Sequence, residues 1–120
     1  MPGISDYTRN KVLNFLKGTA IGTAPTVRTI ALWNGNPGSA GTTGTDVSAS
    51  VSARQNIVWS AAASKIKQNS AAINWGASAG AATVDYWSLR DATTAGNQLW
   101  YGPFSQAKTI AAGDTVEIDI

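Results

Sequence analysis

The side chains that most often carry out catalysis are missing from this 120-residue sequence, which contains no His and no Cys. His is the commonest general base and metal ligand, and the Cys thiolate is a strong nucleophile. Their absence removes zinc, iron–sulfur and haem sites of the ordinary kinds. Seven carboxylates remain, and two carboxylates placed across a sugar ring can hydrolyse a glycosidic bond. The acids considered for such a pair are Asp85, Asp91, Asp114 and Glu117.

The surroundings of these acids argue against that chemistry. Asp91 and Asp114 lie in turn sequences, where an Asp side chain bonds its own backbone, and Glu117 falls on the outward side of a strand pattern. No Gly-Lys-Ser/Thr phosphate loop is present. The glycine-rich segment 34–46 holds a single acid, too few for a calcium site. We therefore expect no enzymatic activity, no catalytic residue, no cofactor and no metal.

The surface implied by the composition is polar but weakly charged. Charged residues make up 13% of the chain, against roughly 25% in ordinary soluble domains. Low charge weakens the repulsion that keeps protein copies apart. The chain also has five Trp residues, a residue type enriched among the anchors of protein contacts. We expect a homotrimer or another homo-oligomer, and a monomer with an unusually neutral surface is the alternative.

Neither nucleic acid nor membrane is expected as a partner. The net charge is only +2, and Lys65 with Lys67 is the nearest approach to a basic cluster outside the N-terminal segment. A nucleic-acid binder gathers many such charges on one face. No apolar run approaches the ~20 residues that span a bilayer. No signal-peptide pattern is present either, so synthesis in a cytoplasm is expected.

One helix is expected, over residues 5–17, and we assign residues 1–18 to this N-terminal helical segment. Ser5 is a suitable N-cap, Asp6 lies in the first turn where a carboxylate is favoured, and Gly18 can adopt the left-handed conformation that ends a helix. Its apolar side chains share one broad face: Val12, Leu13, Phe15 and Leu16. That face either packs onto its own domain or docks onto a neighbouring subunit.

The remainder, residues 19–120, has the pattern of a single β domain. Short segments rich in β-branched and aromatic residues alternate with Gly, Ser, Asn and Asp turns, which favours a mainly β fold. We predict an antiparallel β-sandwich or a jelly-roll-like domain. The expected strands are 26–33, 50–59, 71–75, 83–91, 97–104, 108–111 and 115–120. In the last, Val116, Ile118 and Ile120 should point inward, with Thr115, Glu117 and Asp119 outward.

A long Gly/Thr-rich loop interrupts the β domain at residues 34–46. It contains four Gly, one Pro and no large apolar side chain, so we expect it to contribute nothing to a core. Loops of this length are uncommon and are usually functional or mobile. An arm that reaches along a neighbouring subunit and a flexible surface loop are both open.

Nearly the whole chain resembles a family of short proteins of tailed bacteriophages, commonly labelled tail-fibre or virion structural proteins. The likeness rests on several short motifs: Ser5-Asp6-Tyr7 with Val12-Leu13 and Leu16, Ile30-Ala-Leu-Trp33, Pro37-Gly38, Gly44-Thr45-Asp46-Val47-Ser48, Ala53-Arg54-Gln55, Asn69-Ser-Ala-Ala-Ile73, Thr83-Val84 with Trp87 and Leu89, Asp91-Ala92, Gly96-Asn-Gln-Leu-Trp-Tyr-Gly102 and Gly113-Asp114-Thr115. Before Ala53 the family has a Gly and an aromatic residue, where this chain has Val51-Ser52. The resemblance implies a virion component and no catalytic residues.

We interpret the chain as a non-enzymatic structural component of a tailed-phage virion, made in the host cytoplasm. A capsid decoration or cement protein is the favoured form, because the chain lacks a repetitive shaft and its neutral surface suits tiling. A tail-fibre or baseplate component involved in host attachment is the first alternative, and a carbohydrate-binding module is the second. The partners would be the major capsid protein or tail proteins. The candidate contact residues are Tyr7, Leu13, Leu16, Trp33, Asn36 and Pro37.

Overall fold

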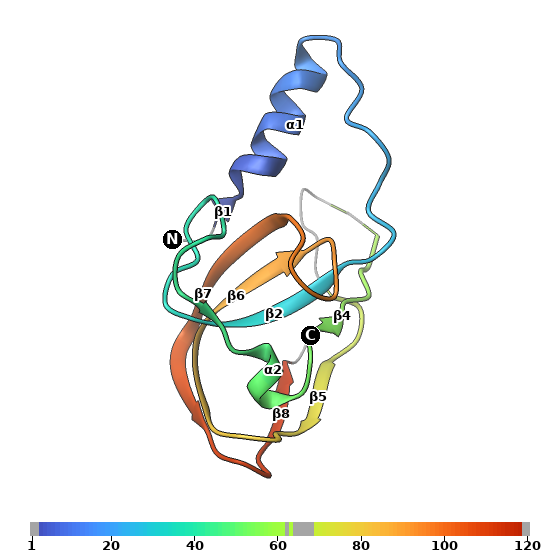
Figure 1. Cartoon of the computed structure of the whole chain (residues 1–120). Coiled ribbons are helices and arrows are strands. Elements are labelled where there is room, and N and C mark those ends of the chain that lie inside the picture. Colours follow the sequence, from blue (N-terminus) through green and yellow to red (C-terminus); the bar gives the residue numbers. More distant parts are fainter. Residues whose placement is uncertain (1–2, 62, 64–68, 119–120) are drawn as a thin grey trace.

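Residues 3–61, 63 and 69–118 are described by the computed structural model, and Figure 1 shows their arrangement. Most of the secondary structure is antiparallel sheet, with a helix near the N-terminus, as the sequence predicted. The elements follow in the order β1 (Gly3–Ile4), α1 (Asp6–Leu16), β2 (Thr29–Asn34), β3 (Thr45–Asp46), α2 (Ser48–Val51), β4 (Gln55–Asn56), β5 (Ile73–Ala77), β6 (Ala82–Arg90), β7 (Gln98–Ile110) and β8 (Thr115–Ile118).

The larger of the two sheets has six strands, in the order β1-β7-β6-β2-β3, with β4 also paired to β2. Its centre is formed by β2, β6 and β7, and all of its pairings are antiparallel. The smaller sheet consists of β5 and β8 alone. The β5–β8 pair has a bulge near Gly76, a residue with a φ of 71° that glycine adopts without strain.

One face of the larger sheet is apolar and packs against the smaller sheet. Ile30 on β2 pairs with Leu89 on β6, and Leu32 pairs with Trp87, so these side chains share a face. Residues from both sheets meet in one core cluster, whose fully and partly buried members include Ile30, Leu32, Ile73, Trp75, Val84, Ile110, Val116 and Ile118. The hydrophobic effect on this face holds the two sheets together.

The opposite face of the larger sheet is polar although it is buried. Thr29, Arg90 and Gln98 follow one another across β2, β6 and β7, and Ser88 lies on the same face. Their exposed fractions are 0% for Thr29 and Ser88, 2% for Gln98 and 6% for Arg90. Buried polar groups need hydrogen-bond partners, so this face requires a cover that supplies them.

The cover is the glycine-rich segment 34–46, and the expectation that this segment takes no part in the interior is wrong. Pro37 is fully buried, and Gly41 is also buried. A Cβ at Gly41 would lie 2.8 Å from Gln98 Cβ, so only glycine allows the backbone to approach the sheet this closely. Apart from Pro37, the segment contributes backbone carbonyls rather than apolar side chains to the interior, and a search for apolar residues overlooks that contribution.

Two further predictions need correction. The strand expected at 50–59 is mostly replaced by α2 and the two-residue β4, because Asp46 Oδ1 accepts hydrogen bonds from Ser48 N at 3.0 Å and Ser48 Oγ at 2.6 Å and turns the chain. The strands expected at 97–104 and 108–111 form the single strand β7. The register of β7 shifts between the pairs Tyr86–Pro103 and Val84–Lys108, so the residues between the two predicted strands form a bulge within one continuous strand.

The last strand follows its predicted alternation within the described residues. Val116 and Ile118 are half-buried, whereas Thr115 and Glu117 are exposed. The two remaining positions of that prediction, 119 and 120, lie outside the described residues. The same holds for the weak basic pair at positions 65 and 67.

Candidate functional site

The most prominent surface feature is an arm, defined here as helix α1 together with the returning segment up to residue 28. Figure 1 shows the helix projecting away from the two sheets. Its boundaries agree with the sequence prediction. Ser5 is the N-cap and accepts a hydrogen bond from Thr8 N at 3.2 Å, and the chain leaves the helix through Gly18, which has a φ of 100°.

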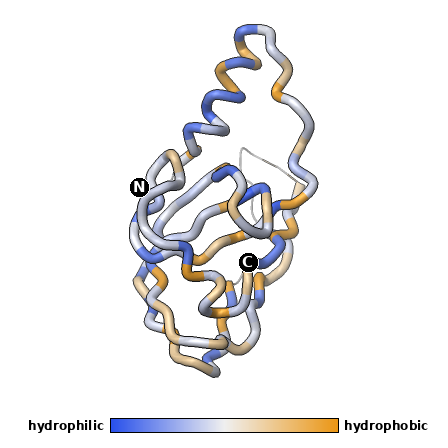
Figure 2. The backbone as a smooth tube through the Cα atoms, in the orientation of Figure 1, coloured by the Kyte–Doolittle hydropathy of each residue, from blue (hydrophilic) through white to orange (hydrophobic). Residues whose placement is uncertain are grey.

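The apolar side of α1 has no partner within the described residues, and no residue of the helix is buried. The exposed fraction is 43% for Val12, 55% for Leu13, 56% for Phe15 and 75% for Leu16. Ile21 on the returning segment is 47% exposed. Hydrophobic positions recur along the arm in Figure 2. Of the two alternatives left open by the sequence, packing of this side onto its own domain is therefore excluded for the described structure.

The other side of α1 faces the returning segment. The ammonium group of Lys11 lies 5.6 Å from the centre of the Tyr7 ring, a cation–π contact one helical turn apart. A Cβ at Gly22 would lie 3.6 Å from Lys11 Nζ, so the returning chain passes beside these two residues. Phe15 follows Lys11 by one further turn on this side, whereas Leu13 and Leu16 lie on another side of the helix, away from the returning segment.

The base of the arm is fixed to the sheet by polar contacts. Ser5 N donates to Leu99 O at 3.2 Å, Ser5 Oγ donates to Gln98 O, and Thr8 Oγ1 donates to Leu99 O at 2.9 Å. On the other side, Asp6 N donates to Ser39 O and Ser39 Oγ donates to Asp6 Oδ2, both at 2.9 Å. The helix therefore begins at a point held by both β7 and the 34–46 segment.

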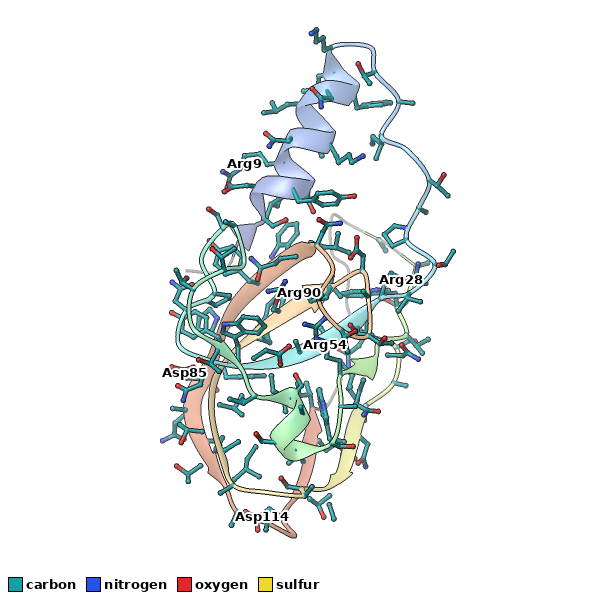
Figure 3. All side chains as sticks on the ribbon, viewed as in Figure 1. Arg9, Arg28, Arg54, Asp85, Arg90 and Asp114 are labelled. Atoms are coloured by element: carbon teal, nitrogen blue, oxygen red, sulfur yellow. The ribbon has the colours of Figure 1, made fainter. Side chains whose placement is uncertain are left out.

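Beneath this base, the guanidinium group of Arg90 joins the polar face of the sheet to its cover. Arg90 Nε donates to Ser88 Oγ at 2.8 Å, and its two terminal nitrogens donate to Gly41 O at 2.9 Å and to Gly96 O at 3.3 Å. The guanidinium carbon lies 4.7 Å from the centre of the Trp33 ring. Burial lowers the pKa of Arg90, and the positive charge of Arg54 adds to the effect. Figure 3 shows Arg90 and Arg54 within the body.

Gln98 completes the connection from the sheet to the arm. Its Oε1 accepts a hydrogen bond from Ser88 Oγ at 2.7 Å, its Nε2 donates to Gly38 O at 2.7 Å, and its backbone oxygen accepts from Ser5 Oγ. One buried polar network therefore links Arg90, the 34–46 segment and the first turn of α1. Such networks rigidify the groups they join when every member is satisfied.

The six residues predicted as contacts are divided by the structure. Tyr7, Leu13 and Leu16 lie exposed on the arm, and Asn36 is exposed on the 34–46 segment. Trp33 and Pro37 are buried within the chain. Trp33 Nε1 donates to Thr43 O at 2.8 Å and so holds the covering segment in place. The supporting residues Arg90 and Gln98 were missed, because their role depends on strand register, which no local motif encodes.

A second polar cluster lies next to the network. Arg54 donates through Nε and one terminal nitrogen to Asp46 Oδ2 at 3.0 and 2.8 Å, and its other terminal nitrogen donates to Ala92 O and Ala95 O. Burial acts to raise the pKa of Asp46, but hydrogen bonds from Ser48 and the contact with Arg54 outweigh it and leave the pKa below its usual value. The cluster ties α2 to the β6–β7 turn.

Two open cavities lie where the sheets part. The first, of about 380 Å³, is lined mainly by Trp59, Trp87 and isoleucine side chains. The second, of about 250 Å³, lies beside Val116 and has Glu117 and Lys108 among its lining residues. Both have Phe104 and Ile118 as walls. We call them the intersheet cavities.

The described residues contain no group of three or more side chains suited to hold a metal ion. Nor does any helix in the described part of the chain have the length and apolar character needed to cross a membrane.

The described chain is thus a β domain that holds an exposed apolar helix on a base of polar contacts. The sequence matches the family model of podophage GP4 fiber I protein gp80 over residues 3–120, and the chain belongs to this family of short-tailed phage virion proteins. No curated protein matches the sequence. The resemblance to tailed-phage virion proteins is thereby confirmed, and with it a structural role in the phage virion together with other virion components.

Proposed function

We propose that the chain is a non-enzymatic component of the tail fibre of a short-tailed phage and is held in the particle by its arm. The single observation that supports the arm as the contact is the exposure of Leu13, Phe15 and Leu16, each more than half accessible to solvent. The fibre assignment is supported by the family description. Capsid decoration, favoured from the weakly charged composition, uses the same kind of contact and differs in location.

The arm has the physical properties that favour docking. Fully burying one large aliphatic or aromatic side chain stabilises a complex by about 1.5–3 kcal/mol, and several such side chains lie on one side of α1. Binding also has an entropic cost, which is smaller when the contact surface is already ordered. The hydrogen bonds of Ser5, Asp6 and Thr8 to the body provide that order at the base of the helix.

Locating the protein on intact particles tests this function. An antibody against the chain should label the tail of negatively stained particles, and quantitative mass spectrometry of purified particles should find it in a fixed ratio to other virion proteins. Labelling of the head would replace the fibre assignment with capsid decoration. Absence of the protein from particles purified through a density gradient would refute the virion role of this chain.

A further inference from the structure

The arm and the intersheet cavities are both apolar surfaces, and they do not contact each other within one chain. Apolar side chains project from α1 without a partner among the described residues, and the two cavities expose Trp59, Trp87, Phe104 and Ile118 without a side chain from the described residues to fill them. Exposed apolar surfaces of this kind mark sites of protein contact. Because both surfaces are apolar, the arm of one molecule has the chemistry needed to cover the cavities of another.

The arm cannot reach the cavities of its own chain while its base is held. The hydrogen bonds of Ser5, Asp6 and Thr8 fix the helix to β7 and to the 34–46 segment, and Figure 1 shows the helix pointing away from β5 and β8. The longest dimension of the described chain is 49 Å, against 29 and 24 Å for the others. The arm therefore extends the molecule at one end, and an arm that contacts these cavities has to belong to another molecule.

The charges at the two ends have opposite signs. The arm has one acid, Asp6, which forms an ion pair with Arg9 at 3.0 Å. Its basic residues are Arg9, Lys11, Lys17 and Arg28. The turn before β8 and β8 itself carry Asp114 and Glu117, with Lys108 beside them on β7. Figure 3 shows Arg9 on the arm and Asp114 at the far end of the body. Complementary potentials of this kind steer association and set its orientation.

Resting on the proposal that the arm is the docking element, we infer that its partner is a second copy of this chain, which receives Leu13 and Leu16, neighbours on one face of α1, in its intersheet cavities. The contact is head to tail, because the surface given by one copy differs from the surface used on the next. A heterologous contact closes into a ring if its rotation permits and otherwise extends as a filament. Either product places copies of the chain around or along a common axis.

Site-directed crosslinking tests this contact, since the chain has no native Cys. Lys17→Cys places a thiol at the tip of the arm, and Ser105→Cys places one at the exposed opening of the second cavity. The two purified full-length variants are treated with a short bismaleimide separately and as an equimolar mixture. A crosslinked dimer should form in the mixture and not in either separate sample.

Matched variants identify the contact that brings the thiols together. Adding Leu13→Ala and Leu16→Ala to the Lys17→Cys chain should reduce the mixed dimer by about tenfold or more, since two buried anchors are lost. Adding Asn10→Ala and Asn14→Ala, two exposed positions on another side of α1, should leave the yield unchanged. Circular dichroism of each variant confirms that α1 is still formed.

Three outcomes would overturn the inference. A dimer from Lys17→Cys alone would indicate helix-to-helix packing, and a dimer from Ser105→Cys alone would indicate contact between cavities. No dimer in the mixture would exclude a second copy as the occupant. In each case, loss of the Leu13→Ala, Leu16→Ala chain from phage particles would still support the proposed function, so the two proposals fail separately.

Discussion

Replacement of Arg90 by Met tests whether the buried polar network holds the covering segment and the base of the arm. The substitution keeps most of the side-chain volume and removes the donors to Ser88, Gly41 and Gly96. It also removes the stacking of the guanidinium group on Trp33. Because Arg90 is only 6% exposed, water cannot readily replace the lost donors.

The magnitude follows from the number and quality of these contacts. Two of the three hydrogen bonds are short, at 2.8 and 2.9 Å, and one is long, at 3.3 Å. A hydrogen bond from a charged group contributes about 1.5–3 kcal/mol. Removal of a buried charge offsets part of that sum, because its desolvation penalty is also relieved. The net expected loss is about 2–4 kcal/mol, a large part of the ~5–15 kcal/mol that stabilises an ordinary domain.

Urea unfolding monitored by Trp fluorescence measures this loss, and Arg28→Met is the matched control. Arg28 is exposed and its side chain donates to Pro25 O at 2.8 Å, so its replacement should change the free energy of unfolding by no more than about 0.5 kcal/mol. Amide exchange in the 34–46 segment should rise in Arg90→Met and not in Arg28→Met. A loss of less than about 1 kcal/mol for Arg90→Met would refute the structural role given to this network.

Three further substitutions probe the core, the covering segment and the acid cluster. Leu32→Ala, at a side chain that is 2% exposed, should lower the free energy of unfolding by about 2–5 kcal/mol in urea, and a loss below about 1 kcal/mol would contradict its place in the core. At Gly44 a Cβ would lie 2.7 Å from Trp33 Nε1, whereas at Gly113, which also has a positive φ, the space is open. Gly44→Ala should therefore lower the free energy of unfolding by about 1–3 kcal/mol more than Gly113→Ala. Equal losses of unfolding free energy in the two variants would argue against the contact with Trp33. The pKa of Asp46 is lowered in the folded protein, so its ionised form stabilises the fold at pH values above its ordinary pKa of 3.8. This stabilisation is lost as the pH falls through the lowered pKa of the folded state, so the difference in unfolding free energy between wild type and Asp46→Asn should narrow over that pH range. A difference that stays constant with pH would contradict the lowered pKa.

Local sequence signals were sufficient for the helix and for the last strand. Ser5 as N-cap and Gly18 as the terminating residue are encoded within one helical turn of the ends that they define, so the bounds of α1 could be predicted. The alternation of Val116 and Ile118 with polar residues likewise needs no information from elsewhere in the chain. The exposure of Leu13 on α1 could not be predicted, because an apolar helix face looks the same whether its partner is its own domain or another molecule.

The errors lie where long-range contacts or backbone geometry decide the structure. The β-branched pattern around Val51 favoured a strand, but the hydrogen bonds from Ser48 to Asp46 turn the chain into α2. The interior role of the 34–46 segment rests on backbone carbonyls that accept from Arg90 and Gln98. These partners lie more than forty residues away along the chain, as the separations of 49 and 60 show. Composition and periodicity carry no information about such pairings.

Incorporation of arm variants into phage particles tests the central claim most directly. A phage lacking the gene is grown in cells that supply either wild-type protein or the Leu13→Ala, Leu16→Ala variant, and copies per particle are measured by mass spectrometry. Because both side chains are more than half exposed, the variant should unfold at nearly the same urea concentration as wild type and yet be lost from the particles. Wild-type copy number for the folded variant would contradict the role of the arm.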